Sequence, residues 1–356
     1  MENKLFQVVI TDTHLKRGNY EQNYHIYQNA CDFAKKNGLG YVLHLGDVFD
    51  SRKSQTLDNL VFFKSILDEV FGESGVKLIV VPGNHDRVDY QSYESYLDPY
   101  EHNPSLTLIR EPKVMSFEDH HLALIPFLQE TTILEEVFNK FVKSKDFKDA
   151  KKSKLPIVGG IHFAVSGVMN NDGSVIDNPM KPKLFSSFDI VLSGHYHNKS
   201  VINKKIHYIG ASIQHTFGET PDKGITTLDN KLKINTLYVE GAKEFKVVEA
   251  NIDNLGVDGI KKLVKNIQKD ESLNVYKMKI VGSKSAVKAF DSSIIKSAGI
   301  KVQKKADEDV IEYDEENFEE VEFSNKDILD EFEKFCIIQD YNKDTIKEGK
   351  NLLTIK

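Results

Sequence analysis

Two histidines, His195 and His197, follow an apolar run and a glycine in the stretch DIVLSGHYHNK, residues 189–199. The apolar run predicts a buried strand, and Gly194 lets the chain turn sharply where that strand ends. Side chains two positions apart in an extended segment point to the same side, so both imidazoles can face one point in space. Because a single His-x-His pair is more often a polar loop feature than a metal site, other segments must supply further ligands.

Carboxylate, amide and imidazole side chains also follow four other predicted strands. The carboxyl ends of strands are where open α/β sheets gather their ligands. One such strand end would mean little, but five in series make a purely structural explanation improbable. The residues are Asp12 and His14 after strand 5–10, Asp47 after strand 41–45, Asn84 and His85 after strand 76–81, and His162 after strand 155–161.

The chemistry that suits this set is the binding of two metal ions. Carboxylate, amide and imidazole donors without thiolate favour Mn²⁺, Fe or Zn²⁺ over Ca²⁺. Two neighbouring cations repel each other, so they need a shared carboxylate, and Asp47 is the natural bridge. Paired ions acidify a bound water and stabilise the attacking and leaving oxygens at phosphorus. The implied reaction is phosphoester hydrolysis.

The elements that must position these residues alternate between strands and helices up to about residue 240. Apolar residues with a 3.6-residue period predict helices at 21–36 and 56–71, between short apolar strands. This order indicates an α/β layered fold. Beyond residue 244 the pattern predicts a small α+β unit with strands FKVVEAN, NVYKMKIVG and IKVQKK and helices near 257–268 and 284–297.

Composition sets the broad class of the protein. A chain of 356 residues with 40% hydrophobic content is long enough for two domains, or for one large domain with an appendage. Its cysteines, Cys31 and Cys336, have no paired spacing, which argues against disulfides and thiolate zinc sites and fits a reducing compartment. We find no signal peptide and no apolar stretch of membrane-spanning length, so we expect a cytoplasmic protein without a membrane anchor.

The net charge of −7 argues at first against a nucleic-acid partner. However, residues 307–322 carry ten acidic and no basic side chains, which leaves −7 + 10 = +3 for the rest of the chain. Six lysines between 143 and 154 could meet phosphates, although a solvated helix and loop would explain them equally well.

The blocks DTH, GDVFD, GNHD, H and GHYH, in this order across residues 12–197, resemble the signature of the calcineurin-like metallophosphoesterases. The stretches HLGDVFDSRKSQ, IHFAVSG and YIGASIQHTFGE are similar to the SbcD-type nuclease subunit of DNA repair and recombination complexes, especially to its tailed-phage counterparts. The resemblance covers about residues 1–240. It implies a two-sheet β sandwich flanked by helices, followed by a small α+β capping domain and a helical C-terminal tail.

The resemblance also implies a role for each motif residue. Two Mn²⁺ ions are expected, with Mg²⁺, Fe or Zn²⁺ as alternatives. His85 would stabilise the transition state or protonate the leaving oxygen, without binding metal. The expected metal ligands are Asp12, His14 and His197 for the first ion, Asn84, His162 and His195 for the second, and Asp47 for both.

Three further residues are weaker candidates. Arg87 could contact phosphate and Asp50 could orient a histidine, although both could equally be polar residues without a role in the reaction. His215 lies in a block of the resemblance and could touch substrate. The other histidines are expected to be structural, with His44 buried in its strand.

The domain order follows from the same resemblance. We expect a metallophosphoesterase (nuclease) domain at 1–243, a DNA-capping α+β domain at 244–306, an acidic linker at 307–323 and a helical tail at 324–356 that docks on a coiled-coil ATPase of the SbcC type. No GxxxxGK[ST] motif occurs, so any use of ATP belongs to a partner. The subunit would act on DNA as a homodimer within a heterotetramer.

Three functions remain open from the sequence. The first is a Mn²⁺-dependent DNA exonuclease and endonuclease, and the second is a phosphatase or cyclic-nucleotide phosphodiesterase on the same scaffold. The third is a non-catalytic DNA-end clamp. The complete ligand blocks argue against a clamp, which has no chemical need for His85 beside Asn84. The added domain and tail argue against a small-molecule phosphatase, which needs neither.

Overall fold

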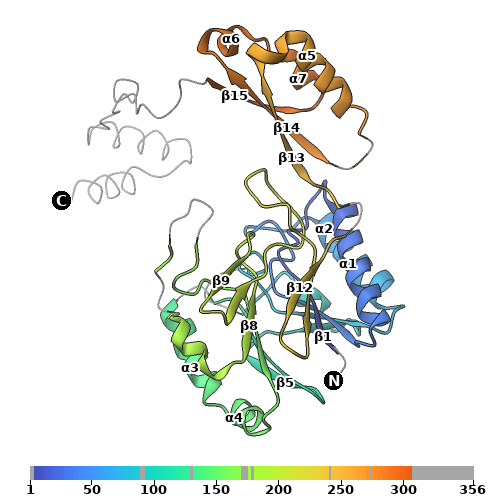
Figure 1. The fold of residues 1–356 in the computed structure, drawn as a ribbon. Coiled ribbons are helices and arrows are strands. Elements are labelled where there is room, and N and C mark those ends of the chain that lie inside the picture. Colours follow the sequence, from blue (N-terminus) through green and yellow to red (C-terminus); the bar gives the residue numbers. More distant parts are fainter. Residues whose placement is uncertain are drawn as a thin grey trace, which may run out of the picture.

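The computed structural model describes residues 4–88, 93–128, 131–169, 175–177, 180–239, 242–270, 272 and 274–306. The predicted acidic linker, 307–323, and helical tail, 324–356, lie outside these residues. The predicted α/β layering is confirmed: two six-stranded sheets face each other with helices on their outer sides, and a three-stranded sheet stands apart from them (Figure 1).

The first sheet has a parallel centre extended by two antiparallel strands. Its order is β12-β11-β1-β2-β3-β4, with β1 to β4 parallel and β11 antiparallel to both β1 and β12. Helices α1 and α2 cover its outer face, and a π-helical turn, Ile66–Phe71, continues α2. The bounds are β1 (Leu5–Ile10), β2 (Tyr41–His44), β3 (Lys77–Val80), β4 (Leu106–Leu108), β11 (Ile225–Asp229), β12 (Ile234–Leu237), α1 (Tyr20–Lys36) and α2 (Leu57–Ser65).

The second sheet repeats this plan on the other side of the core. Its order is β5-β6-β7-β8-β10-β9, with parallel pairing from β6 to β10 and an antiparallel strand at each edge. Helices α3 and α4 lie over its outer face. The bounds are β5 (Lys113–Ser116), β6 (His121–Ile125), β7 (Ile157–Ile161), β8 (Ile190–Ser193), β9 (Ser200–Ile202), β10 (Ile206–Tyr208), α3 (Thr131–Val142) and α4 (Lys145–Lys152).

Along each strand, successive side chains alternate between the core that lies between the two sheets and the layer of helices outside. In β1, Val9 points into the core between the sheets, whereas Val8 and Ile10 contact the helices outside. In β6, Leu124 points inward and Ile125 outward in the same way. Full burial of each such side chain is worth about 1.5–3 kcal/mol. Apolar side chains on both faces of each sheet therefore hold the two sheets together and hold the helices against them. The parallel strands of both sheets end at a common edge.

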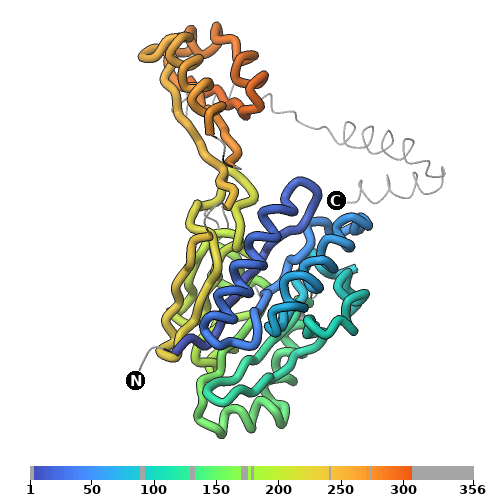
Figure 2. Tube along the Cα trace, turned by 90° about the vertical axis from the view of Figure 1, so that its right-hand side faces the viewer, coloured from blue at the N-terminus to red at the C-terminus, as the bar shows by residue number. Residues whose placement is uncertain are grey.

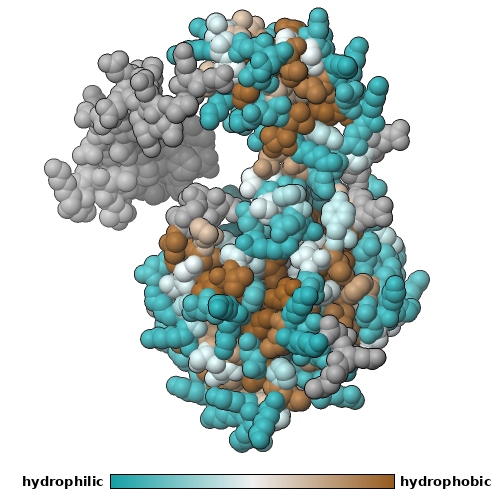
Figure 3. Space-filling view, viewed as in Figure 1, coloured by the Kyte–Doolittle hydropathy of each residue, from teal (hydrophilic) through white to brown (hydrophobic). Residues whose placement is uncertain are grey.

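The third sheet is entirely parallel and is covered on one face only. In the order β13-β14-β15, it packs Ala250, Met278 and Ile280 against the helices and leaves its other face open. Figures 1 and 2 show this unit above the body, and in the space-filling view the two lobes meet at a narrow waist (Figure 3). The bounds are β13 (Phe245–Asn251), β14 (Val275–Gly282), β15 (Lys301–Ala306), α5 (Ile252–Ile267), α6 (Lys284–Ala289) and α7 (Ser293–Ser297).

Some elements differ from those predicted. The helix expected near 257–268 begins earlier, at Ile252, because the Asn251 side chain caps it and Gly256 allows a kink with a φ of 61°. The helix expected at 284–297 is two short helices, since the Asp291 carboxylate accepts a hydrogen bond from the backbone N–H of Ser293 and starts a new turn.

The lysine-rich stretch near residue 150 forms α4 and the segments beside it. Its lysines are exposed and Lys152 pairs with Asp149 at 3.0 Å, which fits a solvated helix. No helix in the described ranges is both long and apolar enough to cross a membrane.

Candidate metal centre

The strand ends bring all seven predicted ligands and His85 to one edge of the sandwich. β1, β2 and β3 deliver residues from the first sheet, and β7 and β8 deliver them from the second. Within the described residues, three groups place one donor atom from each member within 4.8 Å of the others. They are Asp12, His14 and His197; His14, Asp47 and His85; and Asp12, Asp47 and His162.

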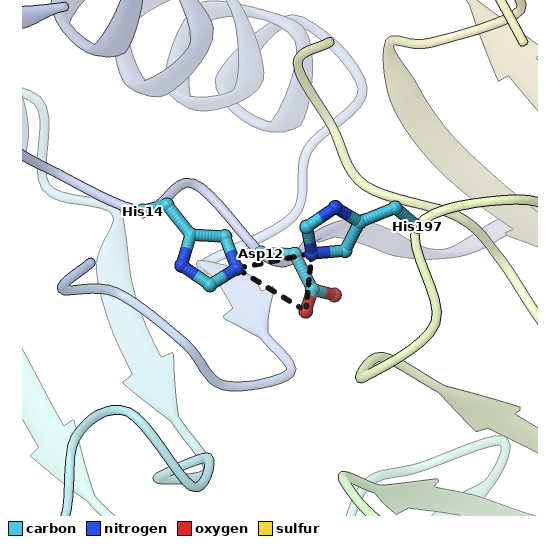
Figure 4. A group of neighbouring side chains, drawn as sticks. All are labelled: Asp12, His14 and His197. Atoms are coloured by element: carbon cyan, nitrogen blue, oxygen red, sulfur yellow. Dashed lines mark hydrogen bonds and ion pairs between the residues drawn. The ribbon is translucent and has the colours of Figure 1, made fainter. Parts of the chain in front are cut away.

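The first predicted set lies around one point. His14 Nε2 and His197 Nε2 are each 3.9 Å from Asp12 Oδ1 and 3.1 Å from each other, and the three side chains point inward together (Figure 4). The Nδ1 of His197 donates to Glu219 Oε1 at 3.0 Å, which leaves Nε2 free for a cation. These converging donors fit a divalent ion.

Asp47 lies between the two predicted sets. Its Oδ1 is 3.2 Å from His162 Nε2, and its Oδ2 is 3.7 Å from His14 Nε2. Each oxygen therefore faces a different group of donors, which is the arrangement that a bridging carboxylate requires. His162 donates from Nδ1 to the Leu45 carbonyl at 2.5 Å, so its Nε2 lone pair faces the cluster.

The second predicted set meets at the Asn84 side chain. Asn84 Oδ1 lies 3.2 Å from His162 Nε2 and 2.9 Å from His195 Nδ1. With the amide reversed, its nitrogen donates to both rings and its oxygen accepts from Arg52 Nε at 3.0 Å. In the first orientation the amide oxygen and the two ring nitrogens converge, so they can hold a cation when both rings present lone pairs. The donors present thus fit a second ion as well.

His85 lies beside these ligands with one ring nitrogen already engaged. Its Nδ1 donates to the Asp50 carbonyl, and its backbone N–H donates to Asp47 Oδ1 at 2.8 Å. The remaining nitrogen, Nε2, is 3.9 Å from Asp47 Oδ2, and the side chain is 22% exposed. This placement allows the predicted role in proton transfer, and it also allows coordination together with His14 and Asp47.

The weaker candidates take different positions. Asp50 orients His85 through its carbonyl, while its carboxylate lies 3.8 Å from His14 Nδ1 and 2.7 Å from Lys16 Nζ. Arg87 is only 3% exposed, and it donates to the carbonyls of Tyr93 at 2.6 Å and Phe127 at 3.0 Å. Its terminal nitrogens hold loops together, so the structure does not bring Arg87 to the open side of the cluster as a phosphate contact.

His215 and His44 support the ligand loops. The Nε2 of His215 donates to the Asp12 carbonyl at 2.7 Å, and its ring centre is 4.9 Å from that of His14. His44 is fully buried, as expected, and its Nδ1 accepts from the Gly46 N–H at 3.2 Å. Both side chains therefore fix backbone segments that carry ligands.

Three polar residues of the site were not predicted. Asp86 accepts hydrogen bonds from the N–H groups of Phe49 at 3.1 Å and Gly83 at 2.9 Å, and so ties together two ligand loops. Glu219 holds His197, and Arg52 lies beside Asn84. Two features of the sequence pointed to these supporting residues. Asp86 directly follows His85, and Glu219 is the last residue of the block YIGASIQHTFGE.

The ligand loops have an unusual backbone. Four of the predicted ligands lie in the left-handed region: Asp12 at φ 50°, His14 at 43°, Asp47 at 55° and His195 at 82°. Hydrogen bonds from Asp12 N to Gly46 O at 2.9 Å and from His14 N to Asp47 O at 3.1 Å hold the first two loops side by side. The surrounding fold maintains a conformation that costs of order 1–3 kcal/mol at each such residue.

Burial and close charges shift the pKa values of the cluster. Burial opposes the charged form of His162, but the Asp47 carboxylate outweighs it and raises the pKa of His162 to about 9. Burial also opposes the charge of Asp47, yet His162 holds the pKa of that carboxyl well below its usual range. Burial, followed by the nearby His162, lowers the pKa of His195 to about 3. In the metal-free protein, a proton on His162 thus balances the charge of Asp47.

Comparisons with known proteins agree with this chemistry. The sequence profile described as calcineurin-like phosphoesterase matches residues 8–199. A protein of Invertebrate iridescent virus 3, provisionally named as a phosphoesterase, is 22% identical over 254 residues, 70% of this chain and 67% of that protein. Exonuclease subunit 1 of Enterobacteria phage T4 is 26% identical over 204 residues, 55% of this chain and 54% of that protein.

Among solved structures, a dimetal phosphatase from Danio rerio aligns with a TM-score of 0.41 and 10% sequence identity, over 67% of this chain and 100% of that chain.

Proposed function

The chain belongs to the calcineurin-like phosphoesterase family, and from this premise we propose that it is a DNA nuclease subunit that hydrolyses phosphodiester bonds with two Mn²⁺ ions. The observation that carries the proposal is the pair of donor sets that share Asp47, with His85 beside them. Asp12, His14 and His197 would hold one ion, and Asn84, His162 and His195 the other.

Different residues of this chain would bind the ions, orient the ligands and transfer a proton. Two divalent ions, when bound, would neutralise charge on the phosphate and acidify a water. Asp47 would set their spacing, and His162 and His197 are kept in the correct tautomer by Leu45 and Glu219. Because the Asp50 carbonyl engages Nδ1 of His85, Nε2 is the atom that would pass a proton to the leaving oxygen.

DNA is favoured over a small phosphoester for two reasons. The phage T4 relative is named as an exonuclease subunit, although this chain spans only 54% of it. In addition, the chain carries a third sheet beyond the sandwich, which a phosphatase for small molecules does not need. A phosphatase or cyclic-nucleotide phosphodiesterase remains the second candidate, because the same donors would serve it.

Cleavage assays with a long and a small substrate test the proposal. Purified protein stripped with EDTA is given Mn²⁺ and either linear duplex DNA or p-nitrophenyl phosphate. We expect DNA cleavage with Mn²⁺ and much less with Mg²⁺, since imidazole donors suit Mn²⁺ and Mg²⁺ favours oxygen ligands and water. Hydrolysis of the monoester without any cleavage of DNA would overturn the proposal in favour of a phosphatase.

The wider assembly is proposed on the sequence resemblance. Residues 1–243 would form the nuclease domain and 244–306 a DNA-capping domain, and two copies would join an SbcC-type coiled-coil ATPase in the cytoplasm. The acidic segment 307–323 would be the tether, and the tail 324–356 the docking element.

A further inference from the structure

Three lysines gather where the open face of the third sheet meets the sandwich. Lys277 Nζ lies 4.6 Å and Lys301 Nζ 5.5 Å from the centre of the Phe217 ring. Lys243 Nζ lies 5.6 Å from the Phe245 ring, which contacts Phe217 edge to face at 5.1 Å. We call Lys243, Lys277 and Lys301 the lysine seam. The two aromatic rings hold its ammonium groups in place.

Within the described ranges, no ion pair offsets the positive charges of the lysine seam. Lys277 and Lys301 are direct partners on adjacent parallel strands, an arrangement of like charges that destabilises a sheet. No described carboxylate forms an ion pair with any lysine of the seam. By contrast, Lys279, two residues along the same face, pairs with Glu249 at 2.8 Å.

Lys243 is also affected by the charge of Lys16, a lysine of the sandwich that pairs with Asp50. Burial and the charges of Lys16 and Lys301 lower the pKa of Lys243. The junction between the third sheet and the sandwich thus holds several cations close together, although one exchange to an acidic residue would reduce their repulsion. Such an arrangement is explained if an external anion supplies the missing charge.

Hydrogen bonds link the segment beside the lysine seam to the predicted metal centre. The backbone N–H of Phe245 donates to Gln214 Oε1 at 2.9 Å, and the next residue, His215, donates to the carbonyl of the predicted ligand Asp12 at 2.7 Å. On the same side Lys16 pairs with Asp50, which orients His85. These contacts place the lysine seam next to the segment that supports Asp12.

We propose that the lysine seam binds backbone phosphates of a DNA strand whose scissile phosphate lies at the metal centre. This inference rests on the proposed function and makes it more specific. The substrate is a polyanion several nucleotides long, because a molecule with one phosphate can occupy either the metal centre or the lysine seam, but not both. The phosphates are recognised by charge, so we expect little dependence on base sequence.

The test compares two triple variants with the same change in charge. The seam variant carries Lys243→Gln, Lys277→Gln and Lys301→Gln. The matched control carries Lys284→Gln, Lys288→Gln and Lys296→Gln, which lie on α6 and α7 over the opposite face of the sheet. Each is assayed with Mn²⁺ on a single-stranded oligonucleotide and on bis(p-nitrophenyl) phosphate, a one-phosphate diester that reports on the metal centre alone.

We expect the seam variant to raise KM for the oligonucleotide by on the order of 10- to 100-fold at 0.1 M salt, and to reduce the slope of log affinity against log salt by about 2. Its hydrolysis of the small diester and both activities of the control should stay near those of the wild type. An oligonucleotide KM equal to that of the wild type, or an equal rise in the control, would overturn the proposal.

A binding measurement keeps this result separate from the proposed function. Fluorescence anisotropy with a labelled oligonucleotide in EDTA needs no catalysis. If the wild type binds but cleaves no DNA, the nuclease assignment fails, while weaker binding by the seam variant than by the control still supports the seam. If both variants bind as the wild type does, the seam fails even when the wild type cleaves DNA.

Discussion

At the scale of the residue, His85 can be separated from the ligands by experiment. Because its Nδ1 is engaged by the Asp50 carbonyl and its Nε2 is the free nitrogen, we expect His85→Gln to keep both ions while activity falls by roughly 10²- to 10⁴-fold. Metal analysis and DNA cleavage on the same preparation check this. Loss of an ion together with activity would show that His85 is a ligand, as its nearness to His14 and Asp47 allows.

Asp47 should behave differently, because its two oxygens face different donor groups. We expect Asp47→Ala to remove both ions and all activity, whereas Asp32→Ala on the exposed side of α1 should change neither. Metal content measured after dialysis distinguishes the two outcomes. Retention of one ion at full occupancy would contradict the bridging role.

The pH dependence of the metal-free protein follows from His162. The folded pKa of about 9 lies above the usual 6.5, so the pair with Asp47 contributes stability that is complete below pH 6.5 and is lost as pH rises through 9. Burial, followed by Asp47, raises the pKa of Asp86 to about 7, so its contribution is lost at lower pH, as pH rises from 3.8 to about 7. The lowered pKa of His195 acts in the opposite sense, because a ring that is buried neutral gains stability as pH rises through 6.5. We therefore expect the Tm in EDTA to fall between about pH 7.5 and pH 9, where His162 dominates.

Scanning calorimetry with and without Mn²⁺ measures this effect. The ion should reduce the fall, because it replaces the proton on His162 and binds more tightly as pH rises. A metal-free Tm that stays constant or rises over the same interval would contradict this account.

Sequence spacing predicted which polar residues meet but not which residues support them. The ligands follow strands one by one, so parallel strand ends sufficed to place Asp12, Asp47 and Asn84 together. The role of Asp86 depends on how closely two loops approach each other, which no spacing shows. The partners of Arg87 could not be foreseen for the same reason: they are the backbone carbonyls of Tyr93 and Phe127. A contact of Arg87 with phosphate stays a prediction.

At the scale of the element, the loop after β3 approaches the loop after β2 closely. A methyl group on Gly83 would lie 2.3 Å from Asp47 Oδ1, 2.5 Å from Asp47 N and 2.7 Å from His162 Nε2. We expect Gly83→Ala to displace these groups, to weaken metal binding and to lower stability by roughly 1–3 kcal/mol.

Gly40 provides the matched control for this substitution. It precedes β2, an added methyl group there meets nothing within 4 Å, and its backbone is not left-handed. Gly40→Ala should therefore leave metal content and Tm unchanged. The prediction is checked by titrating Mn²⁺ into both variants, and equal affinities would refute it.

Element prediction succeeded where apolar runs were long. The five strands expected to end in the predicted ligands all form, because each buries several Val, Ile or Leu side chains. The three-residue strands β4 and β9 were missed, because a strand of three residues is too short to show a clear alternation of apolar and polar side chains. The antiparallel pairing of β11 with β1 joins residues far apart in the chain and cannot be deduced from a local pattern.

At the scale of the whole molecule, the tail was proposed to dock on an ATPase, and it lies outside the described residues. Ile328, Phe332 and Phe335 share one face of the predicted helix, and burial of each phenylalanine would contribute about 1.5–3 kcal/mol to a complex. We expect deletion of 324–356 to abolish co-purification with an SbcC-type ATPase while sparing Mn²⁺-dependent cleavage of single-stranded DNA.

Hydrolysis of bis(p-nitrophenyl) phosphate by the truncated protein is the control for folding. A stable complex with the truncated subunit would place the docking surface elsewhere on the chain.

The overall arrangement was foreseeable only in part. The order of motifs implied the sandwich, and the later alternation of strands and helices implied the small α+β unit. The lysine seam was not foreseeable, because it depends on the register that puts Lys277 beside Lys301 and on Phe217 reaching them from the other lobe.

The left-handed backbone at four predicted ligands has a consequence for how this sequence can change over generations. At these positions, a residue other than glycine, asparagine or aspartate is locally frustrated, and glycine would relieve the backbone. His14 and His195 therefore carry a backbone strain that glycine would avoid, but glycine would also remove the imidazole and its chemistry from the cluster. A lineage released from that chemistry should drift first at these two positions, and it should do so while the sandwich around them stays intact.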